Sequence, residues 1–533
     1  MSRYVFSYWG KRQNLGEETT FFAQVLVLKK KQMDHLRKYV FFPPLILIIC
    51  TILFSQINNE VFSLFITKAN EGILKYFGFI FSWSSFLFII LLAITYFSPI
   101  AKIKIGGKKA KPLLSKGRWF AISICTTIAT GILFWGCAEP LYHYANPPIS
   151  TISPSSTESM SFSMSTMFMH WSFTPYAIYC LAGLVFALSY YNLHRKFSVS
   201  SLIGLKDNED SKTVDAVVDV LCLYSLVLGM SASLGAGILS IIGGIEQIFD
   251  IPKSNFLIGI VGFAIIISFI ISAISGLQKG IKWLSSINIM GFILLACFIF
   301  IFSYPLEITQ IAFTGIQEYI TTFPQRSIDI NSGINQEWRN DWSIFYWANW
   351  FAWAPVASLF LGRISKGYTI REYINFNLIF PSLFAILWMS IFSGATLYLN
   401  QLNGNILFET MSLKGEESVM YGLLNQIGSS SVTIPITLIL IFLSYVTAAD
   451  SNISAMSKIS EKGTTDGEAS TGTKIIWGLV IGGLTYIMLS TKGLDGIRIL
   501  SVLGGFPALF IIIAAGITLI RILLKKELIS KDE

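Results

Sequence analysis

The sequence predicts an all-α polytopic membrane protein with twelve transmembrane helices. Three observations lead to this prediction. Of the 533 residues, 53% are hydrophobic and only 13% are charged, and the mean hydropathy is +0.62. The apolar residues gather in runs of about 20, which is the length that crosses a bilayer as a helix. The segments between these runs alternate between rich and poor in Lys and Arg, as the positive-inside rule expects of a multi-pass protein.

The composition also excludes several classes of protein. An average soluble domain carries about 25% charged residues, so a soluble enzyme is excluded. The net charge of +8 is spread over many loops, and we therefore expect no nucleic-acid partner. Four histidines without an HExxH motif are too few for a multi-haem or multi-copper oxidase, and we expect no cofactor and no bound metal. The cysteines lie in apolar stretches and are expected to be packing residues: Cys50, Cys125, Cys137, Cys180, Cys222 and Cys297.

Each predicted span is an apolar run bounded by loop residues. The twelve spans lie near residues 40–57, 76–98, 119–138, 163–190, 215–248, 256–276, 283–304, 343–362, 373–399, 430–457, 474–490 and 500–524. Residues 305–323 are amphipathic and are predicted to lie along the membrane surface.

The loop charges predict the orientation of the chain in the membrane. The loop after the second span carries seven basic residues: Lys102, Lys104, Lys108, Lys109, Lys111, Lys116 and Arg118. The next loop, 139–162, carries none, and basic residues return after the fourth and eighth spans. The positive-inside rule then places both termini in the cytoplasm. The membrane is expected to be a bacterial-type inner membrane.

Two spans contain features that a simple anchor does not need. Residues 229–237 of the fifth span read GMSASLGAG, and such small residues allow either close helix packing or local unwinding. The tenth span contains Asp450 within the polar run 447–452. Ionisable groups at membrane depth are rare and usually functional, which favours a transport or structural network over an interfacial position.

Two spans also carry an unusual density of Trp and Tyr. At 100° per residue, Trp171, Tyr176 and Tyr179 share a sector of about 140° on the fourth span. On the eighth span, Asn349, Trp350 and Trp353 share a face of about 100°. Two such faces predict an aromatic cage for a quaternary ammonium cation, which binds ring faces because it has no strong hydrogen bond to donate. The alternative for any single ring is an interfacial belt or core packing.

At these residues the chain resembles the betaine/choline/carnitine transporter family. The resemblance runs from about the second span to the twelfth. It is carried by the segments 135–141 (WGCAEPL), 167–171 (MFMHW) with Pro175 and Tyr179, 344–353 (IFYWANWFAW), and 363–372 (RISKGYTIRE). The resemblance implies a LeuT-like fold with two inverted five-helix repeats, a mid-membrane substrate site between broken helices, alternating access and a homotrimer.

The same resemblance implies the organisation of the chain. It divides into a cytoplasmic segment (1–39), two accessory helices (40–98), a first repeat (99–304), an extracytoplasmic loop with an amphipathic helix (305–342), a second repeat (343–524) and a short cytoplasmic tail (525–533).

The chain departs from the family's sodium-coupled members at the positions that hold sodium. Their flexible Gly-Met-Gly-Ile-Gly stretch is similar in position to residues 127–131, where only Gly131 remains a glycine. Their Thr-Ser pair in the tenth span corresponds to Thr447 followed by alanine. Two threonines of a second sodium site correspond to Leu226 and Met230, which offer no hard oxygen ligand.

A lysine takes the place where the resemblance implies a substitute for sodium. Lys282 corresponds to an arginine that stands in for the ion in sodium-independent exchangers of the family. We therefore expect a coupling-cation site formed by Lys282, Thr447, Ile128 and Asp450, in which the lysine supplies a tethered charge and exchanges a proton during the cycle. The alternative is that Lys282 snorkels to the cytoplasmic surface.

The predicted function is secondary transport of glycine betaine, choline or carnitine, driven by protons or by exchange. In the proposed cage, Tyr176 and Asn349 stand where the family has tryptophans. Asn349 and the backbone near Ala129 and Gly131 are expected to meet the other end of the substrate. Arg363 and Arg371 are expected to order a cytoplasmic gating loop, and the alternative for both is topology anchoring.

Two other functions are alternatives to sodium-independent transport. A sodium-coupled betaine symporter is an alternative within the same class. A membrane enzyme or sensor on the same fold is the alternative from another class, and His170 and Asp450 are its only candidate catalytic groups.

Overall fold

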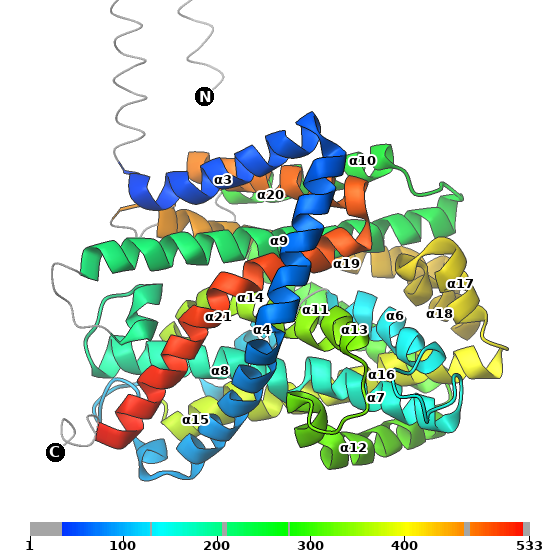
Figure 1. Cartoon of the computed structure of the whole chain (residues 1–533), viewed down its shortest axis with the longest axis horizontal. Coiled ribbons are helices and arrows are strands. Elements are labelled where there is room, and N and C mark those ends of the chain that lie inside the picture. The colour runs from blue at the N-terminus through cyan, green and yellow to red at the C-terminus, as the bar shows by residue number, and fades with distance from the viewer. Residues whose placement is uncertain (1–34, 128–130, 205–210, 276–277, 463–468, 526–533) are drawn as a thin grey trace, which may run out of the picture.

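The computed structural model describes residues 35–127, 131–204, 211–275, 278–462 and 469–525, and these are almost entirely helical (Figure 1). Its helices are α3 (Lys38–Ile57), α4 (Asn59–Phe97), α5 (Lys116–Thr127), α6 (Gly131–Ala145), α7 (Thr157–Trp171), α8 (Phe173–Ala187), α9 (Ser211–Phe249), α10 (Asn255–Ser275), α11 (Gln278–Phe302), α12 (Pro305–Ile328), α13 (Gln336–Arg339), α14 (Phe345–Arg363), α15 (Ile370–Ile374), α16 (Phe380–Leu402), α17 (Ile406–Lys414), α18 (Val419–Ile427), α19 (Ser430–Ser460), α20 (Thr471–Lys492) and α21 (Leu494–Lys525).

Ten helices in the described part of the chain are long and apolar enough to cross a membrane. The pair Ser286–Phe302 and Pro305–Ile328, bent by 103°, brings the number to eleven if it counts as one span. Each of the twelve predicted spans overlaps a helix, but the span expected at 119–138 is divided between α5 and α6. Residues 128–130, between these two helices, lie outside the described residues. The chain is therefore a polytopic membrane protein, and the described residues give ten or eleven spans rather than twelve.

The loops separate into two groups that meet at different places. In the first group, the loop after α4 pairs with the segment before α15 through a bridge between Lys104 and Thr369. In the same loop the carbonyl of Lys104 accepts a hydrogen bond from Asn192, and Tyr191 donates to the carbonyl of Arg363. These are the loops that carry most of the basic residues. In Figure 1, α15 lies at the lower left and α17 and α18 lie at the right.

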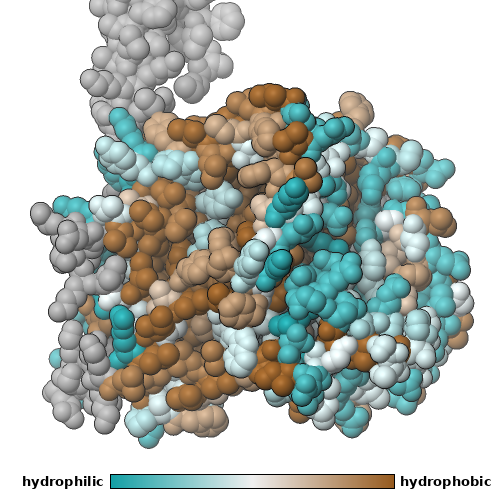
Figure 2. All heavy atoms as spheres, viewed as in Figure 1, coloured by the Kyte–Doolittle hydropathy of each residue, from teal (hydrophilic) through white to brown (hydrophobic). Residues whose placement is uncertain are grey.

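The second group joins the loops that are poor in basic residues. Tyr142, near the end of α6, donates a hydrogen bond to Glu416, and Lys253 lies 2.5 Å from Glu417. Glu416 and Glu417 belong to the short 3₁₀ helix η6 (Glu416–Ser418) between α17 and α18. Apolar side chains cover the left and centre of the face shown in Figure 2, and hydrophilic ones gather toward its right.

The small-residue segment of the fifth span packs closely against neighbouring helices. Helix α9 runs without a break from Ser211 to Phe249, so these residues do not unwind it. Its glycines instead admit neighbouring helices, because a Cβ added at Gly237 would lie 2.4 Å from the ring of Tyr445 of α19. A Cβ at Gly243 would meet the backbone oxygen of Glu417 at the same distance.

The centre of the fold is α14, which packs against α8, α9 and α21. Its close approach to α21 depends on Gly505, where an added Cβ would lie 2.2 Å from the carbonyl oxygen of Ala348. Backbone atoms cannot move aside as a side chain can, so this contact admits only glycine. The helix that carries the predicted aromatic face is thereby fixed against α21.

We therefore expect Gly505→Ala to lower the free energy of unfolding by about 1–3 kcal/mol, the cost of overpacking a well-packed interior. The measurement is the thermal unfolding midpoint of the purified protein in detergent. Gly483→Ala on α20 is the matched control, because its new Cβ would meet only the Cδ1 atom of Ile52, at 3.6 Å. Equal midpoints for the two variants would contradict this account of the α14–α21 contact.

Candidate functional site

The aromatic residues of the fourth span lie at a break between two helices. Helix α7 ends at Trp171 and α8 begins at Phe173, and Ser172 between them has non-helical angles (φ −111°, ψ −111°). Pro175 has no N–H to donate to the carbonyl of Trp171, which favours the break at this place. The break turns Trp171 toward α14, where the aromatic face of the eighth span lies.

Four rings from these helices form a cluster in the protein interior. The ring centroids of Trp171 and Trp350 are 5.2 Å apart, with their planes at 77°. Tyr179 is edge-on to Trp350 at 6.2 Å, and Tyr346 contacts Trp171 at 5.3 Å and Trp350 at 6.2 Å. All four side chains are buried. We call Trp171, Tyr179, Tyr346 and Trp350 the aromatic cluster. Edge-to-face rings of this kind present the π surfaces that attract an organic cation.

A buried carboxylate lies directly behind the aromatic cluster. Glu139 of α6 is 0% exposed. Its Oε2 accepts a hydrogen bond from the indole N–H of Trp171 at 2.9 Å and another from the hydroxyl of Tyr346. A third link joins the helices where the indole N–H of Trp350 donates to the backbone carbonyl of His170 at 3.1 Å. The carboxylate therefore fixes rings from two different helices at once.

Two buried histidines complete the surroundings of this carboxylate. The Oε1 of Glu139 lies 2.6 Å from Nδ1 of His170 and 3.2 Å from Nε2 of His143. The remaining ring nitrogens are also hydrogen-bonded, Nε2 of His170 to Ser343 at 2.9 Å and Nδ1 of His143 to Trp338 at 3.2 Å. The two imidazoles and the carboxylate have the donor types of a metal site and lie close enough together for one. Because every polar atom of the three already has a hydrogen-bond partner, we interpret them as a hydrogen-bond network.

Two arginines bring positive charge to this region. Arg326 of α12 is buried, donates to Ser165 and Thr166, and stacks over the ring of Phe162 at 4.3 Å. Arg498 of α21 lies over three rings next to Tyr346, with its guanidinium carbon 4.7 Å from the centroid of Trp342, 5.7 Å from that of Trp135 and 6.0 Å from that of Phe345. The site thus combines buried aromatic surface with one carboxylate and two guanidinium groups.

The structure brings together part of the predicted cage. Trp171, Tyr179 and Trp350 belong to the aromatic cluster, and a Cβ added at Gly131 would lie 4.0 Å from Cη2 of Trp171. Tyr176 is buried one helical turn before Tyr179. Ala129 lies outside the described residues.

Two residues of the predicted cage face other helices. Trp353 packs against α9, where a Cβ at Gly229 would lie 3.4 Å from its indole nitrogen. Asn349 faces α21, with its Oδ1 3.1 Å from the hydroxyl of Ser501. Asn349, Trp350 and Trp353, which were predicted to share one face of the helix, therefore contact different neighbours of α14 and do not all line one site.

The predicted coupling-cation site is described only in part. Thr447 and Asp450 lie one turn apart on α19, which is helical throughout this region. The hydroxyl of Thr447 is 2.9 Å from the carbonyl of Leu443 and 3.0 Å from that of Ser444. Lys282 belongs to α11, but its side chain lies outside the described residues, as does Ile128. The predicted proximity of Lys282 to Thr447 stays a prediction.

The two arginines predicted to order the gating loop are anchored among the first group of loops. Arg371 donates to the carbonyl of Tyr96 at 3.1 Å and lies over its ring at 5.2 Å. Arg363 lies over the ring of Phe197 at 5.7 Å. Next to Arg371, Glu372 caps the start of α15 through Thr369 and pairs with Lys116 at 2.8 Å. The segment around α15 is thus tied to the loops before α5 and after α8.

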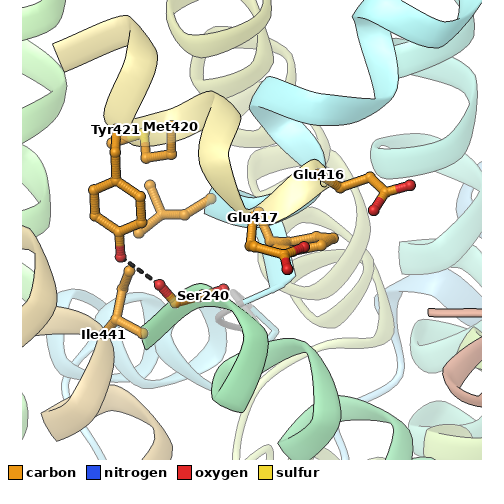
Figure 3. A pocket seen from close by; sticks show the side chains of 8 residues that line it. Ser240, Glu416, Glu417, Met420, Tyr421 and Ile441 are labelled. Atoms are coloured by element: carbon orange, nitrogen blue, oxygen red, sulfur yellow. Dashed lines mark hydrogen bonds between the residues drawn. The ribbon is translucent and has the colours of Figure 1, made fainter. Parts of the chain in front are cut away.

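A small cavity lies elsewhere, between α6, α9, α18 and α19 (Figure 3). The hydroxyl of Tyr421 donates to the backbone carbonyl of Ser240 across it, and Glu416 and Glu417 lie on one side. Its volume is about 10 Å³, which is no larger than a single water requires. The cavity is therefore too small to be the substrate site.

Sequence reasoning missed the residues that hold the aromatic cluster in place. In the sequence, Glu139 and Tyr346 stand out only as parts of characteristic segments, and His170 only as part of one and as a candidate catalytic group of the enzyme alternative. The sequence assigns no role to His143 or Ser343. One feature of the sequence indicates part of this network. Glu139 and His143 lie four positions apart in an apolar segment, and residues at this spacing share a helix face.

Comparison with known proteins identifies the family. The sequence model of the betaine/carnitine/choline family of transporters matches residues 39–528, which is most of the chain. The chain belongs to this family. It is accordingly a membrane transporter rather than an enzyme.

Relatives within the family are named for several related substrates. The chain is 31% identical to the glycine betaine transporter OpuD of Bacillus subtilis, over 80% of this chain and 83% of the relative. It is 28% identical to the ectoine/hydroxyectoine transporter of Virgibacillus pantothenticus, over 85% and 89% of the two chains. It is also 28% identical to the high-affinity choline transport protein of Escherichia coli, over 90% and 71%.

The contact between Glu372 and Lys116 predicts a pH effect at the first group of loops. Partial burial raises the pKa of Glu372, but the hydrogen bonds from Lys116 and Thr369 outweigh it and hold the pKa below the usual 4.5. A depressed carboxyl pKa stabilises the fold above pH 4.5, and this contribution is lost as the pH falls through the lower value. We expect the thermal midpoint of the native protein to fall more steeply than that of Glu372→Gln only below about pH 4.5. Parallel curves would contradict the ion pair.

Proposed function

We propose that this transporter carries a quaternary ammonium compound by alternating access, with glycine betaine as the first candidate and choline, carnitine and ectoine as the others. The observation that carries the proposal is the aromatic cluster at the α7–α8 break. Its rings come from three helices, α7, α8 and α14, are buried, and have a carboxylate behind them. A methylated cation that cannot donate strong hydrogen bonds is the ligand that such a surface selects.

The cluster supports a substrate site made of fewer of the residues that the sequence predicts. Trp171, Tyr179 and Trp350 would hold the ammonium group, joined by Tyr346. Trp353 and Asn349 would contribute only after a movement of α14, since they now face α9 and α21. Gly131 and the backbone near Ala129, which lies outside the described residues, remain the proposed contact for the other end of the substrate.

We also propose that transport does not require sodium. The continuous helix α19 uses its backbone carbonyls in helical hydrogen bonds, and Thr447 is followed by alanine, so one hydroxyl is the most that this position offers an ion. Leu226 and Met230 are buried in α9 and have no oxygen in their side chains. Lys282 would then supply the missing positive charge, with proton coupling or substrate exchange as the driving reaction. Asp450 would belong to the same site.

The proposed architecture is twelve spans with two inverted repeats, the third to seventh and the eighth to twelfth. One feature of the described residues supports it. The third span of each proposed repeat is a helix of more than 30 residues, α9 with 39 and α19 with 31, and these two helices pack together. The basic loops that meet near α15 support a cytoplasmic position for that end and for both termini. Arg363 and Arg371 would hold this end closed. The homotrimer in an inner membrane is proposed from the family alone.

Uptake by proteoliposomes tests the coupling. Labelled glycine betaine, choline, carnitine and ectoine would be supplied with a sodium gradient, a proton gradient or internal substrate in separate experiments. We expect uptake without sodium, and we expect Lys282→Gln to abolish it or to make it sodium-dependent. Lys414→Gln, on the exposed end of α17, is the matched control. A strict sodium requirement in the native protein would overturn the coupling proposal and leave the substrate class standing.

Ligand affinity tests the aromatic cluster. We expect Trp350→Leu to weaken binding of the transported compound about 3- to 30-fold, because each ring face contributes about 0.5–2 kcal/mol to a cation. Binding to the purified protein would be followed by the quenching of tryptophan fluorescence and checked by calorimetry. Trp83→Leu is the control, since Trp83 is 40% exposed on α4. Unchanged affinity in Trp350→Leu would place the substrate elsewhere.

A further inference from the structure

Arg498 of α21 carries a positive charge that its ion pair neutralises only weakly. Its side chain is 20% exposed and pairs with Asp495, three positions earlier, at 3.8 Å. Asp495 is 74% exposed, and an exposed pair at that distance contributes little. The buried Nε of Arg498 has no hydrogen-bond partner in the part of the chain that the structure describes. Because a guanidinium stays protonated in proteins and buried polar groups are normally hydrogen-bonded, this group is available to an anion.

The guanidinium of Arg498 lies among rings that exclude water. Its Cζ atom is 4.7–6.0 Å from the ring centroids of Trp135, Trp342 and Phe345, and these three side chains are buried. Surroundings poor in water lower the effective dielectric constant, so a charge acts there over a longer distance than it does at the surface. The cation–π contacts hold the guanidinium in place and leave its charge in force.

One of these rings connects Arg498 with the aromatic cluster. The ring centroid of Trp135 is 6.2 Å from that of Tyr346. Trp135 also borders Gly131, where an added Cβ would lie 3.6 Å from Cδ1 of Trp135 and 4.0 Å from Cη2 of Trp171. Gly131 therefore borders both a ring of the cluster and a ring that Arg498 covers. It is also the position proposed above for the end of the substrate opposite the ammonium group.

The other charges of this region do not duplicate that of Arg498. The guanidinium of Arg326 lies over the ring of Phe162 and donates to two hydroxyl groups, all of them on α7. Asp341 interacts electrostatically with Arg498, but it is exposed, and solvent screens an exposed charge. Arg498 is thus the guanidinium that stands next to both Trp135 and the aromatic cluster.

We propose that Arg498 is a positioning residue that makes the site select zwitterions, in which a carboxylate lies close to the cationic group, over simple cations. This inference rests on the proposed function, because it takes the aromatic cluster to be the place of the ammonium group. With that group on the rings of Trp171 and Trp350, a carboxylate near Gly131 lies on the side of the guanidinium and is stabilised by it. A cation without a carboxylate meets only repulsion from the same charge. Glycine betaine, carnitine and ectoine belong to the favoured class, and choline does not.

A comparison of glycine betaine with choline isolates the effect on the carboxylate. Both compounds carry the same trimethylammonium group, so the contributions of the rings and of Glu139 are common to both. Two successive ring contacts span roughly 10 Å. At that separation, two unit charges change each other's binding by roughly tenfold at an effective dielectric constant near 20. We therefore expect removal of the guanidinium to reduce the preference for glycine betaine over choline by about 5- to 20-fold.

Calorimetry on the full chain in detergent tests the selection. It would give the Kd of glycine betaine, of choline, and of glycine betaine amide, in which an uncharged group of nearly the same size replaces the carboxylate. We expect the native protein to bind glycine betaine more tightly than the amide, by up to about 20-fold. Equal or tighter binding of the amide by the native protein overturns the proposal, whatever the variants show.

Two variants separate the charge of Arg498 from its packing. Arg498→Gln removes the charge, and we expect the ratio of the Kd values of choline and glycine betaine to fall about 5- to 20-fold, mainly because glycine betaine binds more weakly. Arg498→Lys keeps the charge without the planar group and should keep the preference for the zwitterion. Arg521→Gln is the matched control, because it removes the same charge from an exposed position of α21. It should bind all three ligands as the native protein does.

The outcomes are distinct from those for the proposed function. If Arg498→Gln weakens glycine betaine and choline by the same factor, Arg498 has a packing role only and the selection is overturned. An equal loss of preference in Arg521→Gln overturns it as well, because the effect would then belong to the net charge of the protein. Binding of all three ligands without preference leaves the transport proposal intact and removes the role of Arg498. Failure of the native protein to bind any of them overturns both proposals.

Discussion

The hydrogen bonds to the buried carboxylate of Glu139 are the constraint on which the site depends. This one group receives donors from α6, α7 and α14, and so it ties together helices whose aromatic side chains form the cluster. A carboxylate in the protein interior is expensive unless its oxygens are fully hydrogen-bonded. The saturation of Glu139 removes most of that cost and at the same time leaves the rings of Trp171 and Tyr346 few alternative orientations.

The break between α7 and α8 also frees a polar group that holds two helices together. A continuous helix would use the carbonyl of His170 within its own backbone, but near the break that oxygen accepts from Trp350 of α14. The irregular backbone at Ser172 is tolerated because it lies inside the protein. A helix end, a carboxylate and a set of rings are thereby joined at one depth of the fold, which is the arrangement a transporter needs in order to let a site open toward either side.

Close packing sets how far these helices can move. Gly505 and Gly237 bring α21 against α14 and α19 against α9 with no room for a methyl group. Such contacts are stiff, so a change between inward-open and outward-open forms is expected to carry these pairs as units. In the alternating access proposed above, the loops that meet around α15 and those that meet around η6 would be the contacts that separate in turn.

The sequence by itself determined the class of protein, the position of nearly every helix, the separation of basic from non-basic loops and the faces of two spans that are rich in Trp and Tyr. These follow from local rules, namely the length of apolar runs, the positive-inside rule and the helical period. Only the tertiary structure decided which rings meet and what holds them. Trp350 and Trp353 share a helix face, yet one contacts Trp171 and the other α9. Glu139 reaches donors 32 and 207 positions away in the chain, and no periodicity within a single helix encodes contacts over such separations.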